Sequence, residues 1–258
     1  MSEATATAAK PEMVTFTIDG KTVTAPRGES VLKVAGDNGI RIPHLCYHDA
    51  VEPYGACRLC LVEVTSTSHG RKRTKISTSC NHPALDGIEV VTQSKRIRRN
   101  RRMVLELLMG RVPNSPQLQA LAAEYGLAEE EVRFKKSERE CILCGLCVQV
   151  CRDLVGVDAL GFVGRGVNKE ARAPFGEPSK ECIGCGACVI ACPVDCIKME
   201  ESATRRRIVR WDRELPMKIC DECGYPFMPT FQALHYKKTK GMSLDDFKIC
   251  PDCRPARQ

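Results

Sequence analysis

The residues able to do chemistry in this chain are its cysteines, of which there are 17 in 258 residues. Most of them recur as Cys-x2-Cys pairs, a spacing that puts two thiols on one tight loop, where both can bind one metal centre. Residues 1–13 contain no apolar stretch behind a basic flank, and no run of 18 apolar residues follows. We therefore expect a cytoplasmic protein without a transmembrane segment. Its thiols stay reduced there, which favours metal binding over disulfides.

One spacing, Cys-x2-Cys-x2-Cys-x3-Cys, occurs twice, as CILCGLCVQVC at 141–151 and CIGCGACVIAC at 182–192. It is typical of a pair of 4Fe–4S clusters in which the fourth cysteine of each run binds the cluster of the other run. Gly145, Gly184 and Gly186 keep the loops narrow enough to wrap a cubane. Structural zinc explains this doubled spacing less well. The predicted ligands are Cys141, Cys144, Cys147 and Cys192 for one cluster, and Cys182, Cys185, Cys188 and Cys151 for the other.

A different spacing, Cys-x10-Cys-x2-Cys-x19-Cys, precedes this repeat and joins Cys46, Cys57, Cys60 and Cys80. A 2Fe–2S cluster needs four thiolates. The small residues before Cys57, in GACRLC, let backbone N–H groups approach the sulfurs and help to set the potential. Paired zinc knuckles have shorter gaps between their ligands. The pattern therefore predicts one 2Fe–2S cluster.

Two further pairs end the chain, Cys220 with Cys223 and Cys250 with Cys253. Converging pairs of this kind form a tetrahedral site with four sulfurs. We expect zinc in a small zinc-ribbon-like module, and a single rubredoxin-like iron or a third 4Fe–4S cluster remain as alternatives. Cys196 is left over; we expect a small buried hydrophobic role for it, with a redox role kept open.

The elements that must position these cysteines follow from hydrophobic patterning. MVTFTI (13–18) and KTVTA (21–25) alternate around Asp19-Gly20, which predicts a hairpin. A helix is expected from Ser30 to about Gly39, and strands in LCLVEVTS and GIEVVTQ. The fold class is therefore α+β. The expected domains are a disordered tail (1–12), a 2Fe–2S domain (13–93), a helical linker (94–136), a two-cluster domain (137–204), and a connector with a four-cysteine tail (205–258).

Several segments resemble the 2Fe–2S domain that opens the large iron–sulfur subunit of respiratory NADH dehydrogenases and the iron–sulfur subunit of NAD-linked hydrogenases. They are GESVL (28–32), IPHLCYH (42–48), GACRLCLVEV (55–64) and STSCNHPALDGIEVVT (77–92). The resemblance implies a β-grasp fold for this domain. VGVDALGFVGRG (155–166), between the two later cysteine runs, also occurs in these relatives.

One site of that family is missing from this sequence. The family often carries a His and three Cys for another 4Fe–4S cluster after the helix that matches RRMVLELL (101–108). Residues 110–134 contain neither His nor Cys, so we expect that cluster to be absent. The 2Fe–2S site is then a branch or terminus of the relay, and a fourth iron–sulfur EPR signal would contradict this.

The formal charge of +7 counts every cysteine as neutral. Four sites with thiolate ligands contribute about −8, which leaves the loaded protein near −1. The basic residues 95–102 are interpreted as a solvated helix face, or as a surface for an acidic subunit, because no aromatic residues interleave them.

No nucleotide-binding fingerprint and no catalytic residues are found in the sequence. We therefore expect an electron-transfer subunit of a hetero-oligomeric oxidoreductase, between a flavoprotein that oxidises NAD(P)H and a catalytic subunit. By resemblance, that subunit is of the hydrogenase, formate dehydrogenase, heterodisulfide-reductase or benzoyl-CoA-reductase type, and electron bifurcation stays open. The alternatives are a redox-sensing metal protein whose zinc tail and basic helix bind nucleic acid, and a free-standing ferredoxin.

Overall fold

The computed structural model describes residues 11–134 and 137–254. The chain divides into two compact units, one made of Met1–Asp49 and Pro53–Arg139, the other of Ala50–Glu52 and Glu140–Gln258. Most of the expected disordered tail, residues 1–10, lies outside the described residues. Among the helices of the described residues, none is long and apolar enough to cross a membrane.

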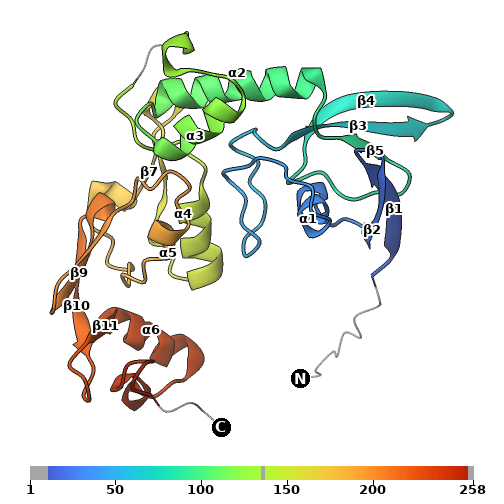
Figure 1. The fold of residues 1–258 in the computed structure, drawn as a ribbon. Helices are drawn as coiled ribbons and strands as arrows, with labels where there is room; N and C mark the ends of the chain where they lie inside the picture. The colour runs from blue at the N-terminus through green and yellow to red at the C-terminus, as the bar shows by residue number, and fades with distance from the viewer. Residues whose placement is uncertain (1–10, 135–136, 255–258) are drawn as a thin grey trace. The chain divides into compact units, whose positions relative to one another are not determined.

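The first unit contains a five-stranded sheet in the order β2-β1-β5-β3-β4 (Figure 1). The expected hairpin forms from β1 (Met13–Ile18) and β2 (Lys21–Pro26), and β1 pairs in parallel with β5 (Glu89–Val91). β3 (Leu61–Ser68) pairs antiparallel with β4 (Arg71–Thr78), a strand that the sequence analysis did not predict. Most of β4 is exposed and polar, so it lacks the apolar alternation that reveals a half-buried strand.

Helices complete this unit. In α1 (Val31–Asp37) the Ser30 hydroxyl accepts a hydrogen bond from the Lys33 backbone N–H, so Ser30 is the predicted N-cap. The linker folds as α2 (Lys95–Arg111), α3 (Pro116–Glu124) and the short turn η1 (Glu129–Glu131). Pro116 stands in the first turn of α3, where its missing N–H costs nothing.

The second unit begins with short elements around the two cysteine runs. The first run contains α4 (Leu146–Gln149) and continues into the π-helical turn η2 (Val150–Val155), and the second run contains α5 (Ala187–Ile190). A small hairpin, β6 (Gly161–Val163) and β7 (Glu170–Arg172), lies between them in the chain, with the turns η3 (Gly166–Asn168) and η4 (Pro174–Gly176).

A four-stranded sheet, ordered β11-β10-β9-β8, follows in the same unit. β8 (Met199–Glu201) and β9 (Arg205–Ile208) form a hairpin across the expected boundary at residue 204. The sheet continues through η5 (Val209–Trp211), β10 (Arg213–Ile219) and β11 (Pro226–Pro229) to α6 (Thr230–Lys240) and η6 (Leu244–Phe247). The C-terminal segment is therefore continuous with the two-cluster region through backbone hydrogen bonds.

Candidate iron–sulfur and metal centres

The four cysteines of the first predicted site are all buried in the first unit. The backbone N–H of Cys57 donates to the Cys46 sulfur at 3.3 Å, and the backbone N–H of Leu45 donates to the Cys57 sulfur at 3.4 Å. Side-chain hydrogen bonds join Cys46 to Cys57 and Cys60 to Cys80. The structure thus brings together thiols that come from loops far apart in the sequence.

Hydrogen bonding makes one thiol of each pair more acidic. The hydrogen bond from Cys46 lowers the pKa of Cys57 to about 6, and the hydrogen bond from Cys80 lowers the pKa of Cys60 to about 7. The pKa of each partner, Cys46 and Cys80, is raised, first by that same hydrogen bond and then by burial. Thiolates are the forms that bind iron, so this closed set of four thiols fits a 2Fe–2S group as donors.

Close packing around this loop explains why Gly55 precedes the first Cys-x2-Cys pair. Gly55 has a φ of 69°, and a Cβ there would lie 2.7 Å from Nδ2 of Asn81. Oδ1 of that Asn81 accepts hydrogen bonds from the Thr78 hydroxyl and the Cys80 thiol, both at 2.9 Å. A side chain at residue 55 would therefore displace a residue that holds a predicted ligand.

Arg101 is a site residue that the sequence pattern does not reveal, because residues 95–102 were expected to form a solvated helix face or a surface for an acidic subunit. Its side chain is fully buried, at 0 % exposure. It donates to the carbonyl oxygens of Leu59 at 3.0 Å and Leu61 at 2.6 Å, and to the Tyr125 hydroxyl at 3.1 Å. Leu59 lies between Cys57 and Cys60, so Arg101 anchors the ligand loop to α2. Its exposed basic neighbours conceal this role in the sequence.

In the second unit, the fourth cysteine of each run lies near the opposite run. The pKa of Cys151 is raised to about 11, first by burial and then by charges on Cys182 and Cys185. Burial also raises the pKa of Cys147, with contributions from thiols that include Cys192. Each fourth thiol is thus close enough to interact electrostatically with the run it was predicted to join.

Hydrogen-bond donors surround these sulfurs as well. The backbone N–H of Leu143 donates to the Cys141 sulfur at 3.4 Å, and the backbone N–H of Ala159 donates to the Cys151 sulfur at 3.3 Å. The indole N–H of Trp211 donates to the sulfur of Cys188 at 3.3 Å. Eight thiols in two interleaved sets, with N–H groups aimed at sulfur, fit two 4Fe–4S groups as donors.

Cys196, which was expected to be a small buried residue, is half-buried and packs against the apolar cluster of this unit. Its sulfur also lies 3.5 Å from the sulfur of Cys192. Spacing alone did not indicate this contact, because Cys196 stands outside both runs.

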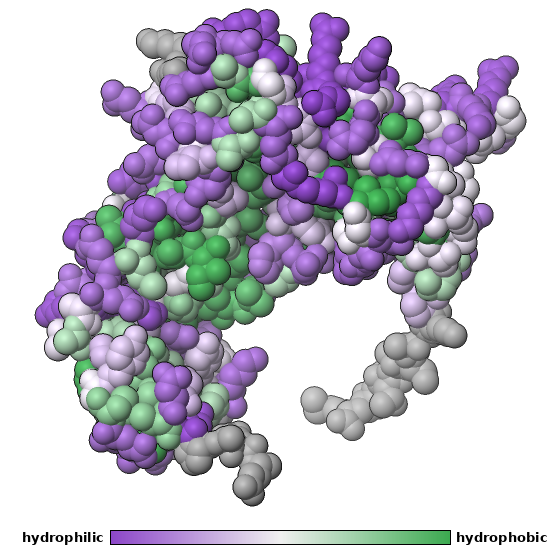
Figure 2. Space-filling model, in the orientation of Figure 1, coloured by the Kyte–Doolittle hydropathy of each residue, from purple (hydrophilic) through white to green (hydrophobic). Residues whose placement is uncertain are grey.

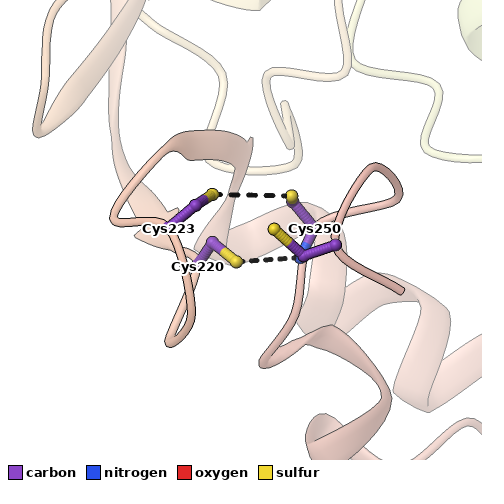
Figure 3. A group of neighbouring side chains, drawn as sticks. Cys220, Cys223 and Cys250 are labelled. Carbon is purple, nitrogen blue, oxygen red and sulfur yellow. Dashed lines mark hydrogen bonds between the residues drawn. The ribbon is translucent and has the colours of Figure 1, made fainter. Parts of the chain in front are cut away.

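The C-terminal cysteines converge from two loops (Figure 3). Cys220, Cys223, Cys250 and Cys253 have sulfurs that all lie within 4.8 Å of one another. Thiols that bind one tetrahedral ion at about 2.3 Å have sulfurs about 3.8 Å apart. A cubane would spread the four sulfurs over four irons, farther apart than one ion does. The group therefore fits a single metal ion.

Backbone donors prepare this site for thiolates. The backbone N–H of Cys250 donates to the Cys220 sulfur at 3.3 Å and is the largest cause that lowers the pKa of Cys220 to about 6. The loops are held by a small apolar cluster of Met228, Ala233 and Phe247.

A cavity of about 530 Å³ opens beside one predicted ligand, Cys185. Its lining includes Leu154 and Ile190, and also His235 and Tyr236 of α6. Figure 2 shows hydrophobic surface gathered over α4 and α5 of this unit. Ile190, in α5, is 87 % exposed.

Two family models match the chain. A 2Fe-2S iron-sulfur cluster binding domain matches residues 11–95, and a 4Fe-4S dicluster domain matches residues 135–199. These ranges contain the first site and both cysteine runs.

Curated relatives share this arrangement along part of their length. The chain is 35 % identical over 177 residues to the NADPH-Fe(3+) oxidoreductase subunit alpha of Geobacter sulfurreducens, which covers 60 % of this chain and 20 % of that protein. It is 31 % identical over 183 residues to the NADH-ubiquinone oxidoreductase 75 kDa subunit of Reclinomonas americana, covering 61 % of this chain and 25 % of that one. The chain thus spans a quarter or less of the length of these two relatives.

A solved structure gives a fuller match. A chain in the crystal structure of an NAD+-reducing [NiFe]-hydrogenase is 34 % identical, with a TM-score of 0.53. The match covers 62 % of this chain and 75 % of that chain. Both cluster domains, the matching relatives and this structure agree with the resemblance seen in the sequence. The chain belongs to the family of iron–sulfur subunits, found in NADH-ubiquinone oxidoreductases and NAD+-reducing hydrogenases, that join a 2Fe–2S domain to a 4Fe–4S dicluster domain.

Proposed function

We propose that this chain is an electron-transfer subunit of an NAD(P)H-linked oxidoreductase, in which it carries one 2Fe–2S and two 4Fe–4S clusters. The observation that supports the proposal is that Cys192 lines one cavity with Cys141, Cys144 and Cys147, while Cys151 interacts electrostatically with Cys182 and Cys185, which is consistent with an exchange of the fourth cysteines between the two runs. Such an exchange is the ligand pattern of two-cluster ferredoxins. When bound, the clusters take up and release single electrons.

The roles of the protein's own residues follow from their contacts. The twelve cysteines of the three sites supply thiolates, and their burial or partial burial limits the access of water to them. Backbone and indole N–H groups donate to sulfur, which stabilises the more negative, reduced state and helps to set its potential. The five-stranded sheet with α1 is the β-grasp that we propose for the 2Fe–2S domain.

We propose zinc for the C-terminal site, in a zinc-ribbon-like module with a structural role. Two facts support this choice: all four donors are thiols, and they are spaced for one tetrahedral ion. A single iron with the same ligands is the remaining alternative, and elemental analysis separates the two.

The proposed partner subunits are inferred from the names of the relatives and from the surface beside Cys185. The relatives named above are subunits whose names specify NADPH, NADH or NAD+ as a reactant. We propose a cytoplasmic hetero-oligomer in which a flavoprotein exchanges electrons with NAD(P)H and a second subunit carries the catalysis. Apolar side chains such as Ile190 and Leu154 line the cavity next to Cys185, where a partner would approach the cluster ligands. The linker, without His or Cys in residues 110–134, makes the 2Fe–2S site a branch or terminus.

The test is elemental analysis with an EPR redox titration of the full chain purified without oxygen. We expect about 10 iron, about 10 acid-labile sulfide and about one zinc per chain, with three distinct iron–sulfur signals. A protein that holds zinc alone would refute the proposal. A fourth iron–sulfur signal would refute the expectation that the linker holds no cluster.

The partner assignment needs its own test. We expect a tagged chain to co-purify from its source cells with a flavin-containing subunit that reduces the clusters when NADH or NADPH is added. Salt-sensitive binding of the loaded protein to DNA or RNA, with no flavin subunit, would favour the nucleic-acid alternative instead.

A further inference from the structure

Cys196 stands outside both predicted ligand sets, yet its thiol lies at the first 4Fe–4S site. Its sulfur is 3.5 Å from the sulfur of Cys192, and its side chain also hydrogen-bonds to Cys141. Both neighbours belong to the same predicted ligand set. Cys196 lines one cavity together with all four members of that set, which also include Cys144 and Cys147.

A tight turn brings this thiol back to Cys192. The backbone N–H of Asp195 donates to the carbonyl oxygen of Cys192 at 3.3 Å, which closes a turn with Pro193 at its second position. Asp195 itself has a φ of 51°, in the left-handed region that non-glycine residues seldom adopt. The turn therefore brings Cys196 close to Cys192.

The distance between the two sulfurs has a chemical meaning. Two thiolates on one tetrahedral metal, with bonds of about 2.3 Å, lie about 3.8 Å apart. Cys192 and Cys196, at 3.5 Å, have nearly that separation. The second site has no equivalent, because the residue four positions after Cys151 is Val155.

We propose that Cys196 is a reserve ligand of the first 4Fe–4S site, able to replace Cys192. This inference rests on the proposed function, since it assumes that the dicluster domain is loaded. When the Cys192 thiolate is lost, the Cys196 thiol releases its proton to solvent and its sulfur binds the iron that Cys192 held. The site keeps four thiolates and the cluster keeps its charge, so no electron is transferred in the exchange.

The experiment compares the full-length, anaerobically purified variants Cys192→Ala, Cys192→Ala/Cys196→Ala and Cys151→Ala with the unmodified chain. Cys151→Ala is the matched control, because it removes the fourth ligand of the site that has no spare thiol. The readouts are iron content and the EPR signals of the 4Fe–4S clusters in the reduced protein. Retention of the metal at the C-terminal four-thiol site, which belongs to the same unit as the substituted residues, reports whether each variant has folded.

We expect Cys192→Ala to keep the full iron content and both 4Fe–4S signals. The double variant and Cys151→Ala should each lose between about one and four irons, as one cluster becomes 3Fe–4S or is lost entirely. Equal iron in the single Cys192 variant and the double variant, whether high or low, would overturn the role of Cys196. Absence of 4Fe–4S iron from the unmodified chain would instead refute the proposed function.

Discussion

The sulfur atoms of the cluster sites differ in the donors that surround them. Most of the N–H donors are backbone groups, which substitution leaves in place, but Cys188 receives a hydrogen bond from a side chain, the indole of Trp211, at 3.3 Å. Burial is the largest cause that raises the pKa of Cys188, to about 12 in total, and the hydrogen bond from Trp211 opposes this rise. Trp211 is itself buried in the apolar cluster of the second unit, so its indole is held in position.

Replacing Trp211 with phenylalanine should lower the reduction potential of one 4Fe–4S cluster. The variant keeps an aromatic ring but loses the N–H that stabilises the more negative, reduced state. A net hydrogen bond of about 0.5–1.5 kcal/mol corresponds to a shift on the order of 20–60 mV for one electron. An EPR redox titration measures it, and the other 4Fe–4S cluster and the 2Fe–2S cluster act as internal controls. Unchanged potentials at full iron content would show that the indole does not tune the cluster.

The helix α2 connects the ligand loop of the first unit to α3 through a buried charge. Arg101 donates to the carbonyl oxygen of Leu59 in the ligand loop, to that of Leu61 at the start of β3, and to the Tyr125 hydroxyl after α3. Burying a guanidinium costs little when it makes all three of these hydrogen bonds. Removing it leaves buried acceptors without donors. Arg101 is thus a fully buried anchor within the basic run of residues 95–102.

The variant Arg101→Gln should destabilise the 2Fe–2S domain by about 3 kcal/mol or more, because glutamine is shorter and cannot donate to all three acceptors. Arg99→Gln is the matched control, since Arg99 lies on the exposed face of the same helix. Urea unfolding followed by the visible absorption of the 2Fe–2S cluster measures the difference. Equal midpoints for the two variants would contradict the anchoring role of Arg101.

Within the second unit, one sheet joins the dicluster region to the metal-binding tail. β8 and β9 border the cluster region, and β10 and β11 carry the loop of Cys220 and Cys223. A Cβ at Gly184, next to Cys185, would lie 2.7 Å from the Leu215 side chain of β10. The tail is therefore packed against a cluster loop, and a metal bound by the four thiols would stabilise one side of that contact.

The variant Cys253→Ser should lose the C-terminal metal while it keeps about 10 iron per chain, because Cys253 belongs only to the four-thiol group of the tail. Without the metal, the segment after β10 should become accessible to limited proteolysis. Zinc and iron analysis with mass spectrometry of the fragments checks both expectations. Cys196→Ser serves as the control and should retain the metal. Full zinc retention in Cys253→Ser would contradict the four-thiol site.

Sequence alone predicted the cluster domains well, because cluster binding fixes the spacing of cysteines on tight loops. The hairpin of residues 13–26 and the helix cap at Ser30 were also predicted, since local turn and capping chemistry determines them. β4 was missed because its stability comes from pairing with β3 along the full strand and not from its own apolar pattern.

The tertiary structure alone decided which residues make contact where no sequence pattern links them. The burial of Arg101 and the approach of Trp211 to Cys188 depend on how separate elements pack, and their neighbours in sequence give no sign of either. The position of Cys196 depends on a turn with a left-handed Asp195, a conformation that the residue type permits but does not require. Cysteine spacing determined which thiols can share a cluster, whereas packing determined which other groups reach those thiols.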